Sequence, residues 1–129
     1  MIKINICMFS LCFILTLLPS ICPGQDMDAK SLYKYVSDGY KENELAFEHA
    51  NKGKIFTVSG IINSIGKTSI TNHPSVTLDA GALSFIQCEF PDSYLEKLLK
   101  FKKGDQFICS CVFKNKMITS VFLERCTIQ

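Results

Sequence analysis

The feature that most constrains the fold is the alternation of apolar and polar residues that begins at Phe56. Phe56, Val58 and Ile62 would face one side of a first strand, while Thr57 and Ser59 face the other. Gly60 lies in register with the apolar set. A missing side chain at such a position indicates a bend or bulge in a curved strand.

Four further strands follow, separated by turn residues. The segment Asn72-His73-Pro74-Ser75 is a turn signal before the second strand, and Ala80-Gly81 turns the chain into the third. Two final strands, around 106–113 and 117–126, are expected to be joined by a polar turn, Lys114 to Met117. The inward-facing set of these last strands is ambiguous, because apolar residues occupy both faces near 107–112.

Two helices complete the pattern. Residues 29–51 show amphipathic helical spacing, with acids at Asp26 and Asp28 for the N-terminal cap and Gly53 as the stop. Gly39 is expected to interrupt or bend this helix. A short second helix is expected in residues 91–104, between the third and fourth strands.

The order is therefore helix, three strands, helix and hairpin. This order, with a curved first strand, predicts a mainly β protein: a five-stranded OB-fold Greek-key barrel preceded by an N-terminal helix. An α+β sandwich is the main alternative.

The N-terminus has the three-part layout of a secretory signal peptide. Lys3 precedes an apolar run from Ile4 to Leu18, and small residues precede a cleavage point expected after Gly24. The run is short for a membrane anchor, which needs about 20 residues. Ile21 before Cys22 disfavours a lipoprotein. We expect a signal peptide (1–24), a helical segment (25–51) and a barrel domain (52–129), in a periplasmic or secreted protein without a membrane span after cleavage.

Charge argues against a nucleic-acid binder. The chain carries 14 basic and 12 acidic residues, and cleavage would remove only Lys3, which leaves a net charge of +1. A nucleic-acid binder usually shows a marked basic surplus. Arg125 is the only arginine, although arginine is the residue best suited to bidentate phosphate recognition.

Four cysteines remain after cleavage: Cys88, Cys109, Cys111 and Cys126. An even number in an exported chain indicates disulfides, and four cysteines allow three pairings. We favour one disulfide between Cys111 and Cys126 and leave the other two thiols open. The Cys109-Ser110-Cys111 spacing lacks the two intervening residues of a zinc knuckle, so no metal site is expected.

No catalytic motif is apparent. Gly66-Lys67-Thr68 resembles the end of a P-loop, but the earlier glycine is misplaced and a turn follows instead of a helix. His49 and His73 suit surface or structural roles, and the nucleophile-elbow motif is absent. We expect no enzyme, no catalytic residues and no cofactor.

Residues from about 29 to 128 resemble the tRNA_anti-like family of small bacterial OB-fold proteins. The resemblance is carried by the stretches YKENELAFEHANKGKIFTVSGIINSIGK, PSVTL, IQCEF, LLKFKKGDQFICSC and VFLERCTI. It implies a barrel that is exported or lipid-anchored. Cys88, Cys111 and Cys126 stand where the family commonly has cysteine, whereas Cys109 replaces a frequent glycine. The resemblance transfers no catalytic residues.

OB-folds usually bind ligands across strands two and three, between two flanking loops. The candidate ligand-binding residues on this basis are Lys67, Thr77, Phe85, Gln87, Lys114 and Lys116. Asp79 and Glu89 on the same face would repel phosphates. We therefore expect a non-catalytic binding module for a protein, peptide or oligosaccharide partner in the cell envelope. The alternatives are a single-stranded nucleic-acid binder and a structural or inhibitory envelope protein.

Overall fold

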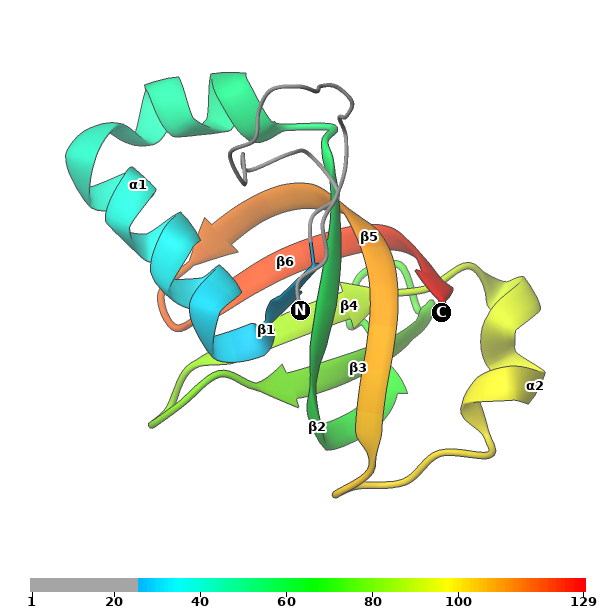
Figure 1. Ribbon diagram of the computed structural model, residues 1–129. Helices are drawn as coiled ribbons and strands as arrows, with labels where there is room; N and C mark the ends of the chain where they lie inside the picture. The colour runs from blue at the N-terminus through cyan, green and yellow to red at the C-terminus, as the bar shows by residue number, and fades with distance from the viewer. Residues whose placement is uncertain (1–25) are drawn as a thin grey trace, which may run out of the picture.

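The computed structural model describes residues 26–129 (Figure 1). The predicted signal peptide, residues 1–24, lies outside the described residues. The elements in chain order are β1 (Asp26–Asp28), α1 (Ala29–Asn51), β2 (Ile55–Lys67), β3 (Pro74–Asp79), β4 (Phe85–Glu89), a 3-10 turn (Asp92–Tyr94), α2 (Leu95–Leu98), β5 (Gln106–Met117) and β6 (Ser120–Ile128).

Five of the strands close into a barrel. β2 pairs antiparallel with β3 and with β5, β4 pairs antiparallel with β3, and β6 lies between β4 and β5. The β4–β6 pair is parallel, and it closes the barrel. The predicted OB-fold is therefore confirmed, and the α+β sandwich alternative is wrong. β1 adds three parallel pairs to the edge of β2.

The long strand β2 serves two neighbours because it bends. Residues 55–61 pair with β5, residues 62–67 pair with β3, and the register shifts between Ile62 and Ser64. The bulge predicted at Gly60 thus lies slightly later, at Asn63. Gly60 has a different role: a Cβ there would lie 3.1 Å from the Cβ of Ala29. Its missing side chain lets α1 start against the barrel.

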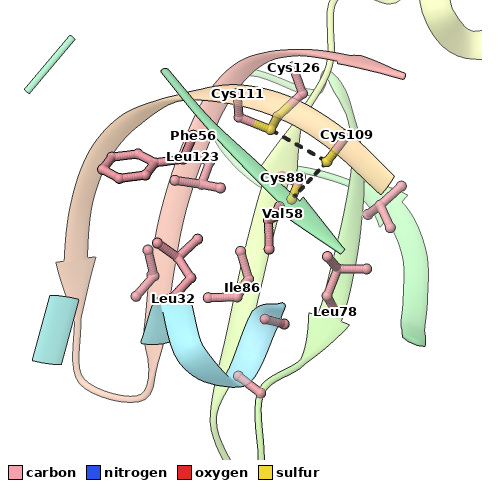
Figure 2. Close-up of a cluster of buried hydrophobic side chains, with 14 of the residues drawn as sticks. Leu32, Phe56, Val58, Leu78, Ile86, Cys88, Cys109, Cys111, Leu123 and Cys126 are labelled. Carbon is pink, nitrogen blue, oxygen red and sulfur yellow. Dashed lines mark hydrogen bonds between the residues drawn. A yellow bond between two sulfur atoms is a disulfide. The ribbon is translucent and has the colours of Figure 1, made fainter. Parts of the chain in front are cut away.

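Inward side chains from all five barrel strands form the core, together with residues of both helices (Figure 2). Burial alternates along β4, and along β3 from Val76 onward, with Val76, Leu78, Ile86 and Cys88 fully buried. In β5 the inward set is Phe107, Cys109, Cys111 and Phe113. This resolves the ambiguity of the sequence, since Ile108 points outward and is exposed.

The helix α1 begins as predicted and bends elsewhere than predicted. The Asp28 carboxylate accepts a hydrogen bond from the Ser31 N–H at 2.7 Å, which caps the N-terminus. The helical backbone breaks at Asn43, whose side chain accepts from the Ala46 N–H at 3.0 Å and so caps the second half. Gly39 remains helical and faces the Phe47 ring, where no Cβ would fit. The predicted bend at Gly39 is therefore wrong.

The two helices lie on opposite sides of the barrel (Figure 1). Phe47 of α1 packs edge-on against Phe113 of β5 at a centroid distance of 5.6 Å. Beside the one-turn helix α2, Phe107 contacts both Phe90 and Phe101 in the same manner. Edge-to-face contacts add to the stability that ring burial provides.

The last hairpin is tighter than the sequence suggested. Residues Lys114 to Met117, predicted to be a turn, are the end of strand β5. Ile118 and Thr119 form the turn, and Ile118 adopts a positive φ of 50°. The polar composition of Lys114–Met117 resembled a turn because these residues extend past the main core.

Candidate binding face

The outer sides of β3, β4 and β6, with one residue of β2, form a continuous polar surface, here called the outer face. Its members alternate along each strand with the buried core residues. They are Ser64, Thr77, Asp79, Phe85, Gln87, Glu89, Ser120, Phe122 and Glu124. Within the described residues, this is the surface on which the OB-fold precedent places a ligand.

Strand register fixes the neighbours on the outer face. Gln87 of β4 lies opposite Thr77 of β3 and opposite Phe122 of β6. One step along β4, Phe85 lies opposite Asp79 and Ser120. Both phenylalanines are partly exposed. The centre of the face thus holds an amide between a hydroxyl and an aromatic ring, with a second ring diagonal to the first.

Three of the six residues predicted from the sequence come together, and the three lysines do not join them. Thr77, Phe85 and Gln87 are near neighbours. Lys67 is exposed at the end of β2. By the alternation along the strand it faces the same side as Ile65, which packs against the core. Lys114 lies on β5, which β6 separates from β4.

Lys116 is already engaged with the N-terminal helix. Its Nζ donates to the Ile118 carbonyl at 2.9 Å and lies 5.6 Å from the centre of the Tyr33 ring. Its backbone N–H donates to the Tyr40 hydroxyl at 3.0 Å, and that hydroxyl donates to the Glu48 carboxylate. Burial and the bond to Glu48 raise the pKa of Tyr40. These contacts hold the β5–β6 turn against α1.

Two loops frame the outer face at opposite ends of β4. At one end, the Phe85 N–H donates to the Thr119 carbonyl at 2.9 Å. At the other, the Thr71 hydroxyl donates to the Glu89 carboxylate at 2.8 Å. His73 Nδ1 lies 3.0 Å from the Asp92 carboxylate, and this hydrogen bond raises the pKa of His73. The β2–β3 loop (residues 68–73) is thus attached to the end of β4.

The outer face is acidic. Asp79, Glu89 and Glu124 contribute carboxylates, and none of its nine positions is a lysine or arginine. Arg125, just beside the face, lies 3.5 Å from the Glu124 carboxylate. The sequence predicted a negative charge here from Asp79 and Glu89, and Glu124 of β6 adds a third carboxylate.

Sequence reasoning missed the contribution of β6. Ser120, Phe122 and Glu124 alternate with the buried Val121 and Leu123, so the pattern was visible in the letters SVFLE. The alternation alone does not show which strand lies beside β6. Only the parallel β4–β6 pairing brings Phe122 beside Gln87.

The interior holds a second notable group, four buried cysteines (Figure 2). Cys111 and Cys126, the pair favoured from the sequence, form a disulfide with an S–S distance of 2.03 Å. The Cys109 sulfur lies 3.5 Å from that of Cys111 and 3.7 Å from that of Cys88. The contact with Cys109, together with burial, raises the pKa of the Cys88 thiol.

The two histidines do not combine with other groups into a catalytic arrangement within residues 26–129. His73 is paired with Asp92 at the surface, and both side chains are well exposed. His49 is exposed near the end of α1. Among these same residues, no helix has the length and hydrophobicity needed to cross a bilayer.

Solved structures with a similar fold include a lipoprotein from Klebsiella pneumoniae subsp. pneumoniae, named as an inferred nucleic acid-binding protein. It is 15% identical, with a TM-score of 0.63, over 82% of this chain and 92% of that one. At this identity the likeness shows the fold alone.

Two OBody proteins solved bound to hen egg-white lysozyme, AM3L09 and AM1L10, are more distant. Their TM-scores are 0.44 and 0.43, at 15% and 16% identity, over 61% and 62% of this chain and 84% and 83% of theirs. No curated protein matches the sequence. The tRNA_anti-like family model matches residues 25–127, nearly all of the part that the structure describes. Sequence and fold agree, and the chain belongs to the tRNA_anti-like family, whose domain is a binding fold.

Proposed function

We propose that this protein is an exported, non-catalytic binding module whose outer face binds an uncharged oligosaccharide of the cell envelope. One observation carries the proposal. Two partly exposed rings, Phe85 and Phe122, stand beside Thr77 and Gln87 on a face whose nine positions include three carboxylates, with its nearest cations, Lys114 and Arg125, at the edge.

The chemistry of this face suits a sugar. Aromatic rings offer apolar area with a defined orientation, and they pack against the C–H face of a pyranose ring. Amide, hydroxyl and carboxylate groups supply the few directed hydrogen bonds that fix a polar ligand. Gln87 and Asp79 can both accept from sugar hydroxyls. OB-folds are known to bind oligosaccharides on this face.

A protein or peptide partner fits the outer face less well. The large apolar residues that stand most exposed on strands lie on β2 and β5. They are Ile55, Ile61, Ile108 and Met117. Protein interfaces usually place apolar anchors at their centre. The centre of the outer face instead holds a hydroxyl and an amide beside one partly exposed ring, Phe122.

Single-stranded nucleic acid is the second candidate, favoured by the name of the Klebsiella relative. Bases could stack on Phe85 and Phe122. However, Asp79 and Glu89 would repel the phosphates, and such proteins provide a positive groove. The lysine closest to the β5–β6 turn, Lys116, is engaged with Ile118 and Tyr33.

The absence of an enzymatic role and the export of the chain are parts of the same proposal. In the described residues His73 and Asp92 form an exposed pair at one end of the outer face, and the cysteines are buried. The N-terminal sequence has the layout of a cleavable signal. N-terminal sequencing of the protein recovered from its native envelope tests the export, with Gln25 as the expected first residue.

An array of neutral and charged oligosaccharides tests the ligand class. The wild-type protein should bind neutral glycans, and Phe122→Ala should lose the signal. Ile55→Ala, a change at an exposed position on β2, is the matched control and should keep it. If no glycan is bound, or if both variants bind as the wild type does, the proposal is wrong.

A further inference from the structure

The four cysteine sulfurs inside the barrel converge on one point. They come from β4 (Cys88), β5 (Cys109 and Cys111) and β6 (Cys126), and all four lie within 4.8 Å of one another. Cys109 and Cys111 both point inward because they are two residues apart on a strand. Segments far apart in sequence thus supply four sulfurs to a single interior site, which the short Cys-x-Cys spacing did not suggest.

The distances match those of a tetrahedral metal–thiolate centre. With Zn–S bonds of about 2.3 Å, an ideal tetrahedron places its sulfurs about 3.8 Å apart. The Cys88–Cys109 and Cys109–Cys111 distances are already 3.7 Å and 3.5 Å. The disulfide-bonded pair is much closer than the tetrahedron allows, and all four sulfurs lie within 4.8 Å of one another. Opening that one bond would let the four sulfurs surround an ion.

The surroundings select the kind of ion. All four cysteines are buried, and the site offers sulfur without oxygen or nitrogen side chains. Thiolate sites prefer soft or borderline ions such as Zn²⁺ and exclude Mg²⁺ and Ca²⁺. The regular β5–β6 pairing is also interrupted opposite Cys111, where Arg125 takes a positive φ.

We propose that the reduced protein binds one Zn²⁺ ion through Cys88, Cys109, Cys111 and Cys126, so that the barrel interior carries either a disulfide or a metal. Reduction of the Cys111–Cys126 bond takes two electrons and two protons from a dithiol, which becomes a disulfide. Zn²⁺ then replaces the four thiol protons, which leave as acid, and four Zn–S bonds form. This proposal does not depend on the ligand of the outer face.

The ion must enter during folding, because the sulfurs are shielded in the closed barrel. Metal binding is then coupled to folding. The test therefore refolds the protein with Co²⁺ in the presence of a phosphine reductant, then replaces Co²⁺ by Zn²⁺. The expected result is one Co²⁺ per chain, with the visible bands of tetrahedral thiolate coordination, and a higher Tm with metal than without.

Cys109→Ala is the decisive variant, because it removes a central sulfur and leaves the Cys111–Cys126 disulfide possible. Its fold is first checked in the oxidised form by circular dichroism. In the reduced form it should bind Co²⁺ roughly 100-fold more weakly or worse, beyond the 10–100-fold cost of losing an outer-shell partner. Ser110→Ala, the neighbour on the outside of the same strand, is the matched control and should bind normally.

Three results would overturn the proposal. The reduced wild type could fold without binding Co²⁺. Cys109→Ala could bind Co²⁺ as tightly as the wild type. Co²⁺ could also bind only to chains that circular dichroism shows to be unfolded, with no rise in Tm.

Discussion

The inner and outer sides of the same three strands, β3, β4 and β6, differ in what they encode. On the inside, Val76, Ile86 and Leu123 are fully or almost fully buried. On the outside, their immediate neighbours Thr77, Gln87 and Phe122 form the centre of the outer face. Adjacent residues of one strand thus have separate roles: the inner one stabilises the core, and the outer one belongs to the proposed binding face. Substitutions of adjacent residues should therefore affect different measurements.

The largest effect on stability is expected on the inner side. Leu123→Ala should lower the free energy of unfolding by about 2–5 kcal/mol, because it leaves a cavity in a closed core. Phe122→Ala should lower it by less than half as much, since its ring is partly exposed. Urea denaturation of both variants measures the difference. Equal losses would remove the distinction between the two sides.

The disulfide stabilises the folded barrel mainly by restricting the conformations of the unfolded chain. Cys111 and Cys126 are separated by 15 residues, for which cross-linking is worth about 3 kcal/mol. The double variant Cys111→Ala/Cys126→Ala should therefore lower Tm substantially in calorimetry. Cys88→Ala, which leaves the disulfide intact, is the control for lost packing and should have the smaller effect. A double variant no less stable than Cys88→Ala would contradict this role.

Substitutions on the outer side should change the affinity for a ligand rather than the stability of the fold. Once a glycan ligand is found, Phe122→Ala should weaken its binding by about 10-fold or more, the usual effect of removing an aromatic anchor. Leu123→Ala, assayed at a temperature where it is folded, should keep most of the affinity. Titration calorimetry provides both values. The two-sided account would not survive a loss of affinity in Leu123→Ala alone.

A smaller effect is expected where α1 holds the β5–β6 turn. Tyr40→Phe removes the acceptor of the Lys116 N–H and the donor to Glu48. It should cost about 1 kcal/mol of stability. Hydrogen exchange should speed up at the Lys116 amide while the buried β3 and β4 amides stay protected. Unchanged exchange at Lys116 would show that this hydrogen bond does not hold the turn.

The smallest effect concerns pH. The Asp92 carboxylate raises the pKa of His73, so the pair stabilises the fold fully below the unfolded pKa of histidine, about 6.5. This contribution is lost as the pH rises through the higher folded pKa. In an NMR titration His73 should titrate above the ordinary histidine pKa, and Asp92→Asn should bring it back down. A His73 pKa unaffected by Asp92→Asn would exclude the interaction.

Much of the inner side could be predicted from the sequence, because burial leaves a periodic mark. The alternation of Val76 and Leu78, the Asp28 cap and the Gly53 stop are all local signals, and the structure shows each of them. The break of α1 at Asn43 was not predictable in this way. It depends on how Phe47 packs over Gly39, which is a tertiary contact.

The candidate site was less predictable because binding surfaces carry no period of their own. Fold precedent proposed Thr77, Phe85 and Gln87 as candidates, whereas Phe122 became a candidate only through the β4–β6 pairing. Lys116 looked like a free loop charge, and only the structure shows its contacts with Tyr33 and Ile118. The convergence of four cysteines likewise required the closed barrel.

Titration of two ligands across salt concentration distinguishes sugar recognition from nucleic-acid recognition on the outer face. A neutral oligosaccharide from the array and a labelled single-stranded DNA are titrated separately into the wild type and Phe122→Ala. We expect glycan binding that is insensitive to salt and lost in Phe122→Ala, with no DNA binding even at low salt. Tight DNA binding that weakens log-linearly with salt would contradict this expectation and assign the outer face to nucleic acid.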